Sequence, residues 1–435
     1  MKLINTSALL FTGNISIAVL SLVLGIFTAR YLGPESRGLL YLVIQVITIG
    51  SIIIAGGLGP AYQYYLSSGQ FNRSEIFSHA LLQTCLIAVI VCLLLTIGYP
   101  LFNLVGIENL VETFFYVIAS GIIFNVIVIF VNSVLMTDPK GVLSLTVLNV
   151  GGSLANASLF VAFALLFAVN IDMALIAYFI GLLIRMIVGV YIAGHGISIT
   201  ISLQWQAMYR KLFKYGSASF LFNLSVVMVL RVDTFIVNNF VGLQELGQYA
   251  VAVTLAEMVL MLPSSIGTAL FALFPTLDSK AQVELLKKTC RAVIAVTGVI
   301  CIGLAVISPM LVTILMGEKY VDAIAPLRAM LPGLVALATA YVFANYFAGT
   351  GHPILGAGVF GLGLVVKVGL NYLLVPPLGI LGAAIASSVA YIAIAFAFYV
   401  LLYRMQSVTA ASLFIPTFED MQVMAAHVKT FIKKR

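Results

Sequence analysis

The sequence predicts an all-α polytopic membrane protein with about twelve transmembrane helices, and two observations carry this prediction. Of the 435 residues, 62% are hydrophobic and only 9% are charged, whereas a soluble domain has about 25% charged residues. Apolar runs of about 20 residues recur from end to end, and each is long enough to cross a ~30 Å hydrocarbon core as a helix. The composition therefore excludes a water-soluble fold.

Clusters of Gly, Pro and charged residues separate the apolar runs. The first run is too long for a signal peptide, so it is predicted to be a retained helix. The predicted spans are 8–29, 39–60, 79–98, 113–135, 144–168, 172–193, 214–239, 247–273, 289–308, 325–347, 354–374 and 380–403. Beyond them, apolar residues recur every three or four positions from Phe418 to Phe431. This pattern predicts a C-terminal amphipathic helix on the bilayer surface.

Lys and Arg in the loops set the predicted orientation. Fifteen of them fall on one side of the membrane if the N-terminus is cytoplasmic, and four fall on the other side. The positive-inside rule therefore places both termini in the cytoplasm. The formal net charge of +7 is attributed to topology and to attraction for membrane lipids, because no basic patch outside the short loops and the tail suits nucleic acid.

Two segments indicate an internal repeat. The stretch "ARYLGPESRGLLY" begins at Ala29, and "NNFVGLQELGQYA" begins at Asn238. Gly33 and Gly38 in the first match Gly242 and Gly247 in the second, both at an offset of 209. Six predicted helices separate the copies, so the halves have the same orientation, as in parallel-repeat transporters. The alternative is a chance likeness of Gly-rich turns.

The repeat divides the chain into two six-helix lobes around a central cavity. The predicted units are an N-terminal lobe (1–195), a cytoplasmic linker (196–213), a C-terminal lobe (214–404) and a basic amphipathic cytoplasmic tail (405–435).

Charges inside the predicted spans must face a partner or a wet cavity. Arg231 and Glu257 are symmetric about position 244, in the turn between the seventh and eighth spans. An antiparallel hairpin places them at the same depth, so they are predicted to pair or to act together. Asp233 lies on another face of its helix. It needs a different partner, a proton or a cation.

Two further intramembrane cations, Arg185 and Lys367, have no carboxylate at an obvious matching depth. Snorkelling to the interface is one explanation for Lys367. The other explanation, which applies to both, is that they hold an anionic ligand in the cavity.

Asparagines follow single faces of three predicted helices. They are Asn125 and Asn132 in the fourth span, Asn149 and Asn156 in the fifth, and Asn371 in the eleventh, one turn from the lysine just named. A single amide in a bilayer can simply join two helices. Several such stripes together favour a hydrated cavity, so these residues are predicted to line it with Arg185, Lys367 and Arg231.

No pattern of enzymatic chemistry competes with transport. The four His residues are scattered, and the four Cys residues fall in apolar segments without a CxxC pair. No G-x-S-x-G or P-loop motif occurs, and no loop is long enough for a soluble active site. No cofactor or metal is expected, and the protein is predicted to move its substrate without changing it.

At "ARYLGPESRGLLY", "LRVDTFIVNNFVGLQELGQYA" and "PPLGILGAAIAS", the chain resembles the polysaccharide-transporter branch of the multidrug/oligosaccharidyl-lipid/polysaccharide exporter superfamily, which includes Wzx-type O-antigen flippases. The resemblance implies a V-shaped pair of lobes, alternating access and a charged cavity. It also implies flipping of an undecaprenyl-diphosphate-linked oligosaccharide to the outer leaflet of a bacterial inner membrane, for cell-surface polysaccharide synthesis.

Candidate coupling ions are H⁺ and Na⁺, with Asp233 and Glu257 as candidate coupling residues. Candidate protein partners are a glycan polymerase and a chain-length regulator. Two other functions stay open. A cation-coupled multidrug exporter would use the carboxylates and would be hindered by Arg185 and Lys367, whereas a membrane glycosyltransferase or polymerase would need a larger external loop.

Overall fold

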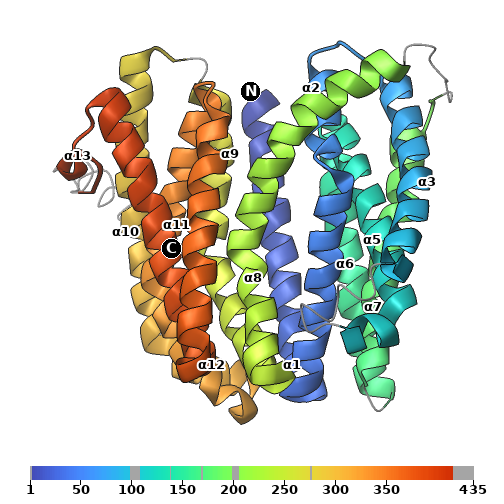
Figure 1. The fold of residues 1–435 in the computed structure, drawn as a ribbon, viewed down its shortest axis with the longest axis vertical. Coiled ribbons are helices and arrows are strands. Elements are labelled where there is room, and N and C mark those ends of the chain that lie inside the picture. The colour runs from blue at the N-terminus through green and yellow to red at the C-terminus, as the bar shows by residue number, and fades with distance from the viewer. Residues whose placement is uncertain are drawn as a thin grey trace, which may run out of the picture.

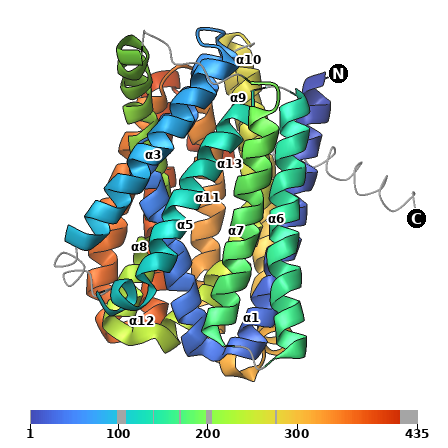
Figure 2. The ribbon, with the colours of Figure 1, turned by 90° about the vertical axis from the view of Figure 1, so that its right-hand side faces the viewer.

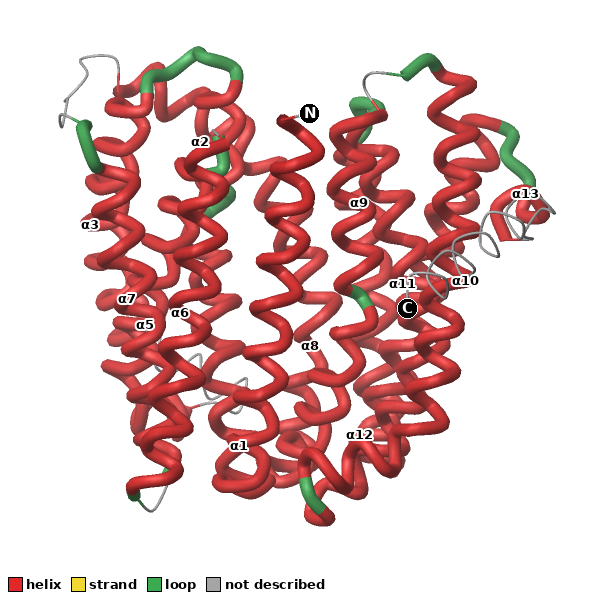
Figure 3. Tube along the Cα trace, turned by 180° about the vertical axis from the view of Figure 1, so that it is seen from behind, coloured by secondary structure: helices red, strands yellow, loops and turns green. Residues whose placement is uncertain are grey.

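The computed structural model describes residues 2–97, 108–137, 139–167, 170–197, 205–274 and 277–414. Within these ranges all regular structure is helical, and the long helices lie side by side along a common direction (Figure 1). Short connections join them (Figure 3). Nine helices of the described residues are long and apolar enough to cross a membrane, which makes this a multi-pass membrane protein.

The first half of the chain forms one group of helices, which Figure 2 shows from its outer side. Apolar residues at most positions suit these helices to a bilayer, where their outward faces contact lipid rather than water. The helices are α1 (Lys2–Ala55), α2 (Leu58–Ser67), α3 (Arg73–Ile97), α5 (Glu108–Leu135), α6 (Pro139–Leu166) and α7 (Ile171–Gly194). The side chain of Asn170 caps α7 by accepting a hydrogen bond from the Met173 N–H at 3.0 Å.

The second half forms the other group. It comprises α8 (Trp205–Val259), α9 (Met261–Leu273), α10 (Ser279–Leu311), the short turns η3 (Val312–Met316) and η4 (Glu318–Ala323), α11 (Ile324–Gly349), α12 (Pro353–Gln406) and α13 (Ala410–Phe414). On α10, Val299, Ile302 and Val306 are each about 70% exposed. Such an apolar face suits lipid contact rather than water.

Three of the helices reverse direction at one glycine each. The backbone of Gly33 in α1, Gly242 in α8 and Gly379 in α12 has a positive φ of 76°, 85° and 59°. Residues 26 apart would be about 39 Å apart along a straight helix, yet Arg231 and Glu257 of α8 are in contact at 2.6 Å. Only glycine adopts these angles without strain, so one residue is enough to fold each helix into a hairpin.

The observed turns are therefore tighter than the predicted ones. Helical structure continues through most of the intervals 30–38, 240–246 and 375–379, which separate predicted spans. The predicted second span is instead interrupted near its far end, where α2 begins, and the predicted eighth span near its middle, where α9 begins. The amphipathic helix expected at 418–431 lies outside the described residues.

The two groups approach closely where the first two hairpins turn, and we call this end of the bundle the turn end; at the opposite end, α2 also touches the first arm of α8. A Cβ on Gly38 would overlap the carbonyl oxygen of Leu243, and a Cβ on Gly247 would overlap the carbonyl oxygen of Pro34. Glycine is required at both positions because the backbones approach so closely. The N-terminus lies at the opposite end of the bundle (Figure 1).

Labelling of single cysteines tests the predicted orientation. Arg37 is only 5% exposed, so exposed Glu35 replaces it as the probe of the first turn. In a cysteine-free background, an impermeant thiol reagent added outside is expected to label Glu35→Cys and Lys319→Cys but not Lys211→Cys or Lys288→Cys. Labelling of Lys211→Cys from outside would contradict the orientation.

Candidate functional site

A cavity of about 570 Å³ lies between the two groups of helices. Both arms of the α1 hairpin form one wall, and the second arm of α8 with the start of α9 forms the other. Its polar lining consists of Asn14, Ser21, Thr28, Arg37, Tyr41, Gln45, Thr254, Glu257 and Ser264. Exposed Asn14 and Ser264 mark the side away from the turn end, where the cavity reaches the surface.

Arginines of the first hairpin help to close the turn end. Arg30 donates hydrogen bonds to the carbonyl oxygens of Ile314 and Leu315, the latter from Nε at 2.9 Å. The Arg37 guanidinium donates to the Gly25 carbonyl at 2.5 Å. It also lies 5.6 Å from the centre of the Tyr320 ring, a distance at which a cation is attracted to an aromatic face. These contacts join the first group of helices to η3 and η4 of the second.

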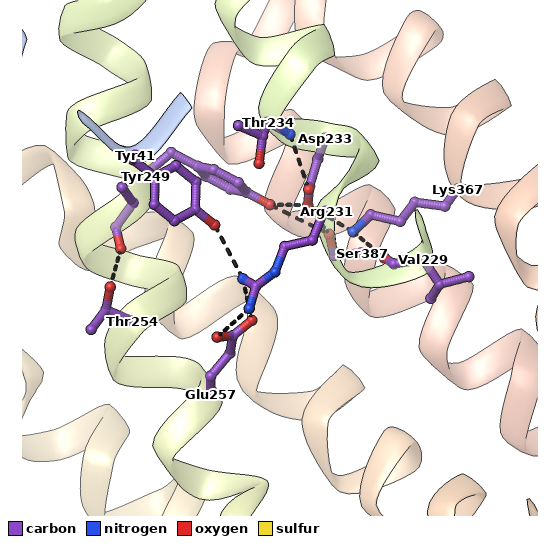
Figure 4. Close-up of polar contacts among 11 residues, drawn as sticks. Tyr41, Val229, Arg231, Asp233, Thr234, Tyr249, Thr254, Glu257, Lys367 and Ser387 are labelled. Carbon is purple, nitrogen blue, oxygen red and sulfur yellow. Dashed lines mark hydrogen bonds and ion pairs between the residues drawn. The ribbon is translucent and has the colours of Figure 1, made fainter. Parts of the chain in front are cut away.

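The ion pair predicted for Arg231 and Glu257 is present (Figure 4). The guanidinium donates from both terminal nitrogens, with Nη1 at 2.6 Å from Oε1 and Nη2 at 3.0 Å from Oε2. Nη1 also donates to the Tyr41 hydroxyl at 3.2 Å. Arg231 therefore joins α8 to α1 beside the cavity.

A second ion pair corrects the prediction for Lys367. Its ammonium lies 2.7 Å from Asp233 Oδ2 and donates to the Val229 carbonyl at 2.6 Å (Figure 4). The same carboxylate oxygen accepts hydrogen bonds from the hydroxyls of Tyr249 at 2.5 Å and Ser387 at 3.1 Å.

The exposed fractions of the Lys367 and Asp233 side chains are 0% and 3%. The prediction that Lys367 lacks an acidic partner is therefore wrong, and this lysine does not line the cavity. Asp233 is the partner, because the α8 and α12 hairpins pack together and bring the two charges to similar depths.

Arg185 lies within the first group of helices, away from the cavity just described. Its Nη2 donates to Asn149 Oδ1 at 2.8 Å. Its stem fits against Gly152, where a Cβ would overlap it. Its Nε is buried without a hydrogen-bond partner, and no carboxylate of the described residues lies within ion-pair distance. Within the described part of the chain, Arg185 therefore has an amide as its partner and not a carboxylate.

None of the five predicted asparagines lines the described cavity. Asn149 binds the arginine of α7, and Asn156 packs where α6 crosses Gly181 of α7. Asn371 is fully buried and donates to the Lys367 carbonyl at 2.8 Å. Asn125 and Asn132 are half-buried in α5. Helical periodicity correctly groups residues on one face, but it does not tell which face turns to the cavity.

Glu257 is the one predicted site residue that lines the cavity, whereas Tyr41, Gln45 and Thr254 were missed. Sequence periodicity could have found Tyr41 and Gln45, because they follow Arg37 at four-residue steps on one helix face. Among the described residues no three His, Cys, Asp or Glu side chains come together in a way that could hold a metal ion.

The fold is that of a transporter class with solved members. The chain superimposes on a structure described as "Lipid II flippase MurJ, inward closed conformation" with a TM-score of 0.77 at 14% identity, covering 93% of this chain and 89% of that one. It also matches an inward-facing multidrug resistance MATE family transporter of the MOP superfamily, with a TM-score of 0.71 at 18% identity and coverage of 91% and 98%. Both show the fold of the MOP superfamily.

Within this class, residues 27–325 match the family described as polysaccharide biosynthesis protein, and the chain belongs to that family. A curated relative from Shigella flexneri, named "Putative O-antigen transporter", is 22% identical over 397 residues, which cover 88% of this chain and 93% of the relative. The resemblance noted from the motifs is thereby confirmed, and the protein is a flippase or transporter of polysaccharide biosynthesis.

Proposed function

We propose that the protein flips a polyprenyl-diphosphate-linked oligosaccharide, of the undecaprenyl type, from the inner to the outer leaflet of a bacterial plasma membrane. The observation that supports this most is the cavity between the two groups of helices, in a chain of the polysaccharide family. The Arg37 guanidinium lines it and the Arg231 guanidinium lies behind Glu257, and guanidinium groups suit a diphosphate. Its hydroxyl and amide side chains suit sugar hydroxyls, while the polyprenyl tail stays in lipid.

The proposal includes the architecture predicted from the repeat. Three of the nine described spanning helices are glycine hairpins that contribute two crossings each, which gives twelve spans. The spans form two six-helix lobes, 1–195 and 214–404, joined by the linker 196–213 and followed by the tail 405–435. Both termini are cytoplasmic in this arrangement. The lobes alternate between closure at the turn end and closure at the opposite end. The described contacts of Arg30 and Arg37 belong to the first of these states.

A multidrug exporter is the second candidate, because the Glu257 carboxylate lines the cavity and a carboxylate can hold a cationic drug. The bidentate contact of Glu257 with Arg231 favours the flippase, since this carboxylate is already neutralised by the arginine and does not need a cationic drug.

Deletion of the gene in its own host tests the proposal whichever glycan the protein carries. We expect the deletion strain to lose surface polysaccharide and to accumulate the lipid-linked oligosaccharide in the inner leaflet. The wild-type gene on a plasmid should restore export. Unchanged surface polysaccharide, together with new sensitivity to cationic dyes, would instead support the drug exporter.

Arg185 remains a proposed anion-binding residue of the first lobe. Arg185→Gln is expected to reduce surface polysaccharide at least tenfold, because among the described residues its charge has an amide partner but no carboxylate and can hold an anionic ligand. Arg185→Lys should restore part of the export, since an ammonium offers no bidentate fork. Polysaccharide is quantified at matched membrane levels of protein, with exposed Lys214→Gln as the control. Full export by Arg185→Gln would exclude this role.

A further inference from the structure

The two intramembrane ion pairs of the second group differ in their access to the cavity. Asp233 and Lys367 are sealed, with side chains that are at most 3% exposed. Arg231 and Glu257 are half-buried, with side chains that are 21% and 33% exposed, and Glu257 lines the cavity wall. A ligand in the cavity can therefore contact Glu257 of the second pair, with Arg231 directly behind it, but neither residue of the first pair.

Glu257 holds Arg231 in the geometry that a phosphate would use. Two contacts, of 2.6 and 3.0 Å, join the planar guanidinium to the two carboxylate oxygens. Two oxygens of a diphosphate fit the same fork, since guanidinium binds carboxylate and phosphate in the same bidentate manner. The carboxylate and an incoming diphosphate therefore need the same donors and cannot hold them together.

The same guanidinium also reaches the other group of helices. Arg231 Nη1 serves both Glu257 and the hydroxyl of Tyr41 in α1. A ligand that takes this nitrogen breaks a bond within the α8 hairpin and a bond between the two groups at once. Occupancy of the cavity and contact between the groups are thus linked through one side chain.

We propose that Glu257 is an internal competitor of the substrate's diphosphate for Arg231, so that substrate binding displaces the carboxylate and substrate release lets it return. This inference rests on the proposed function for the identity of the anion. It explains how a cationic cavity can release a doubly charged headgroup: the carboxylate replaces the leaving anion, and Arg231 is never left buried and unpaired. The cost of an unpaired buried charge is several kcal/mol, which exchange avoids.

Binding of farnesyl diphosphate to the purified protein in nanodiscs tests the proposal, with farnesol as the probe that lacks the diphosphate. We expect Glu257→Gln to bind farnesyl diphosphate about tenfold more tightly than the wild type, because a neutral amide competes poorly for a guanidinium. Export by this variant should fall, since release is slowed. Arg231→Gln should bind the two probes equally. Exposed Glu284→Gln on α10 is the matched control and should bind as the wild type does.

Glu257→Asp separates contact from charge, and it also serves if Glu257→Gln fails to fold. Its carboxylate keeps the charge but is too short for the bidentate contact. If Glu257 competes through direct contact, Glu257→Asp should bind farnesyl diphosphate with an affinity between those of the wild type and Glu257→Gln. If only the negative charge matters, Glu257→Asp should bind it as the wild type does. An unchanged or weaker affinity in both variants would overturn the proposal. Loss of surface polysaccharide on gene deletion is scored separately, so the proposed function and the competitor role can fail independently.

Discussion

Lys367→Met is expected to lower the free energy of unfolding by about 3–5 kcal/mol, because it leaves the buried Asp233 carboxylate without its cation. The Asp233 carboxylate and the Lys367 ammonium lie 2.7 Å apart with almost no exposed surface. Water cannot solvate the remaining charge, so the full desolvation penalty falls on the folded state. We expect little monodisperse protein after detergent extraction, and a large drop in the thermal midpoint of whatever is recovered, measured by fluorescence-detected size exclusion.

The double variant Asp233→Asn, Lys367→Met is expected to recover a large part of this stability, since both charges are gone and the volumes are similar. Lys288→Met, at an exposed position of α10, controls for the loss of a lysine. Equal damage in the single and double variants would show that the pair is not the source of the effect. Loss of export by Lys367 variants would therefore report on folding, not on a ligand in the cavity.

Gly38→Val is expected to abolish export while the helices still fold. A side chain at this position meets the carbonyl oxygen of Leu243 in the other hairpin, and a backbone atom cannot move aside as a side chain can. The two groups then cannot close at the turn end. We expect surface polysaccharide at the level of the deletion strain, and increased labelling of a cysteine placed at the cavity residue Thr28 by an impermeant reagent added from the turn-end side.

Gly303→Val is the matched control, because a Cβ at this exposed position of α10 meets nothing within 4 Å. It should fold and export normally. Full export by Gly38→Val, or unchanged labelling at Thr28 in that variant, would show that close approach at this glycine is not needed for the transport cycle.

The sequence predicts contacts within a hairpin better than contacts between hairpins. Arg231 and Glu257 are symmetric about position 244, two residues past the glycine of one hairpin, so their pairing follows from counting residues. Asp233 and Lys367 lie nine and twelve residues before the glycines of two different hairpins, or about 14 and 18 Å in helical rise. Their depths are similar, but nothing in the sequence indicates that these two hairpins pack together.

The rotation of each helix is also poorly determined by sequence. In a bilayer, apolar side chains face both lipid and neighbouring helices, so the usual contrast between a polar and an apolar face is weak. Asn149 and Asn156 share a face of α6, as predicted, but that face turns to α7. The cavity residues Tyr41 and Gln45 are uncharged, so no intramembrane charge marks them in the sequence.

The contact between the first two hairpins has the form of a homodimer interface. Gly38 meets Leu243, and Gly247 meets Pro34; a shift of 209 positions turns Pro34 into Leu243 and Gly38 into Gly247. The two contacts are therefore equivalent: replacing each residue of the first contact by its counterpart in the other copy gives the second contact. This equivalence is the rule of an isologous interface about a two-fold axis. The single chain therefore contains the kind of joint that two identical half-length subunits would form, but its two sides differ in sequence.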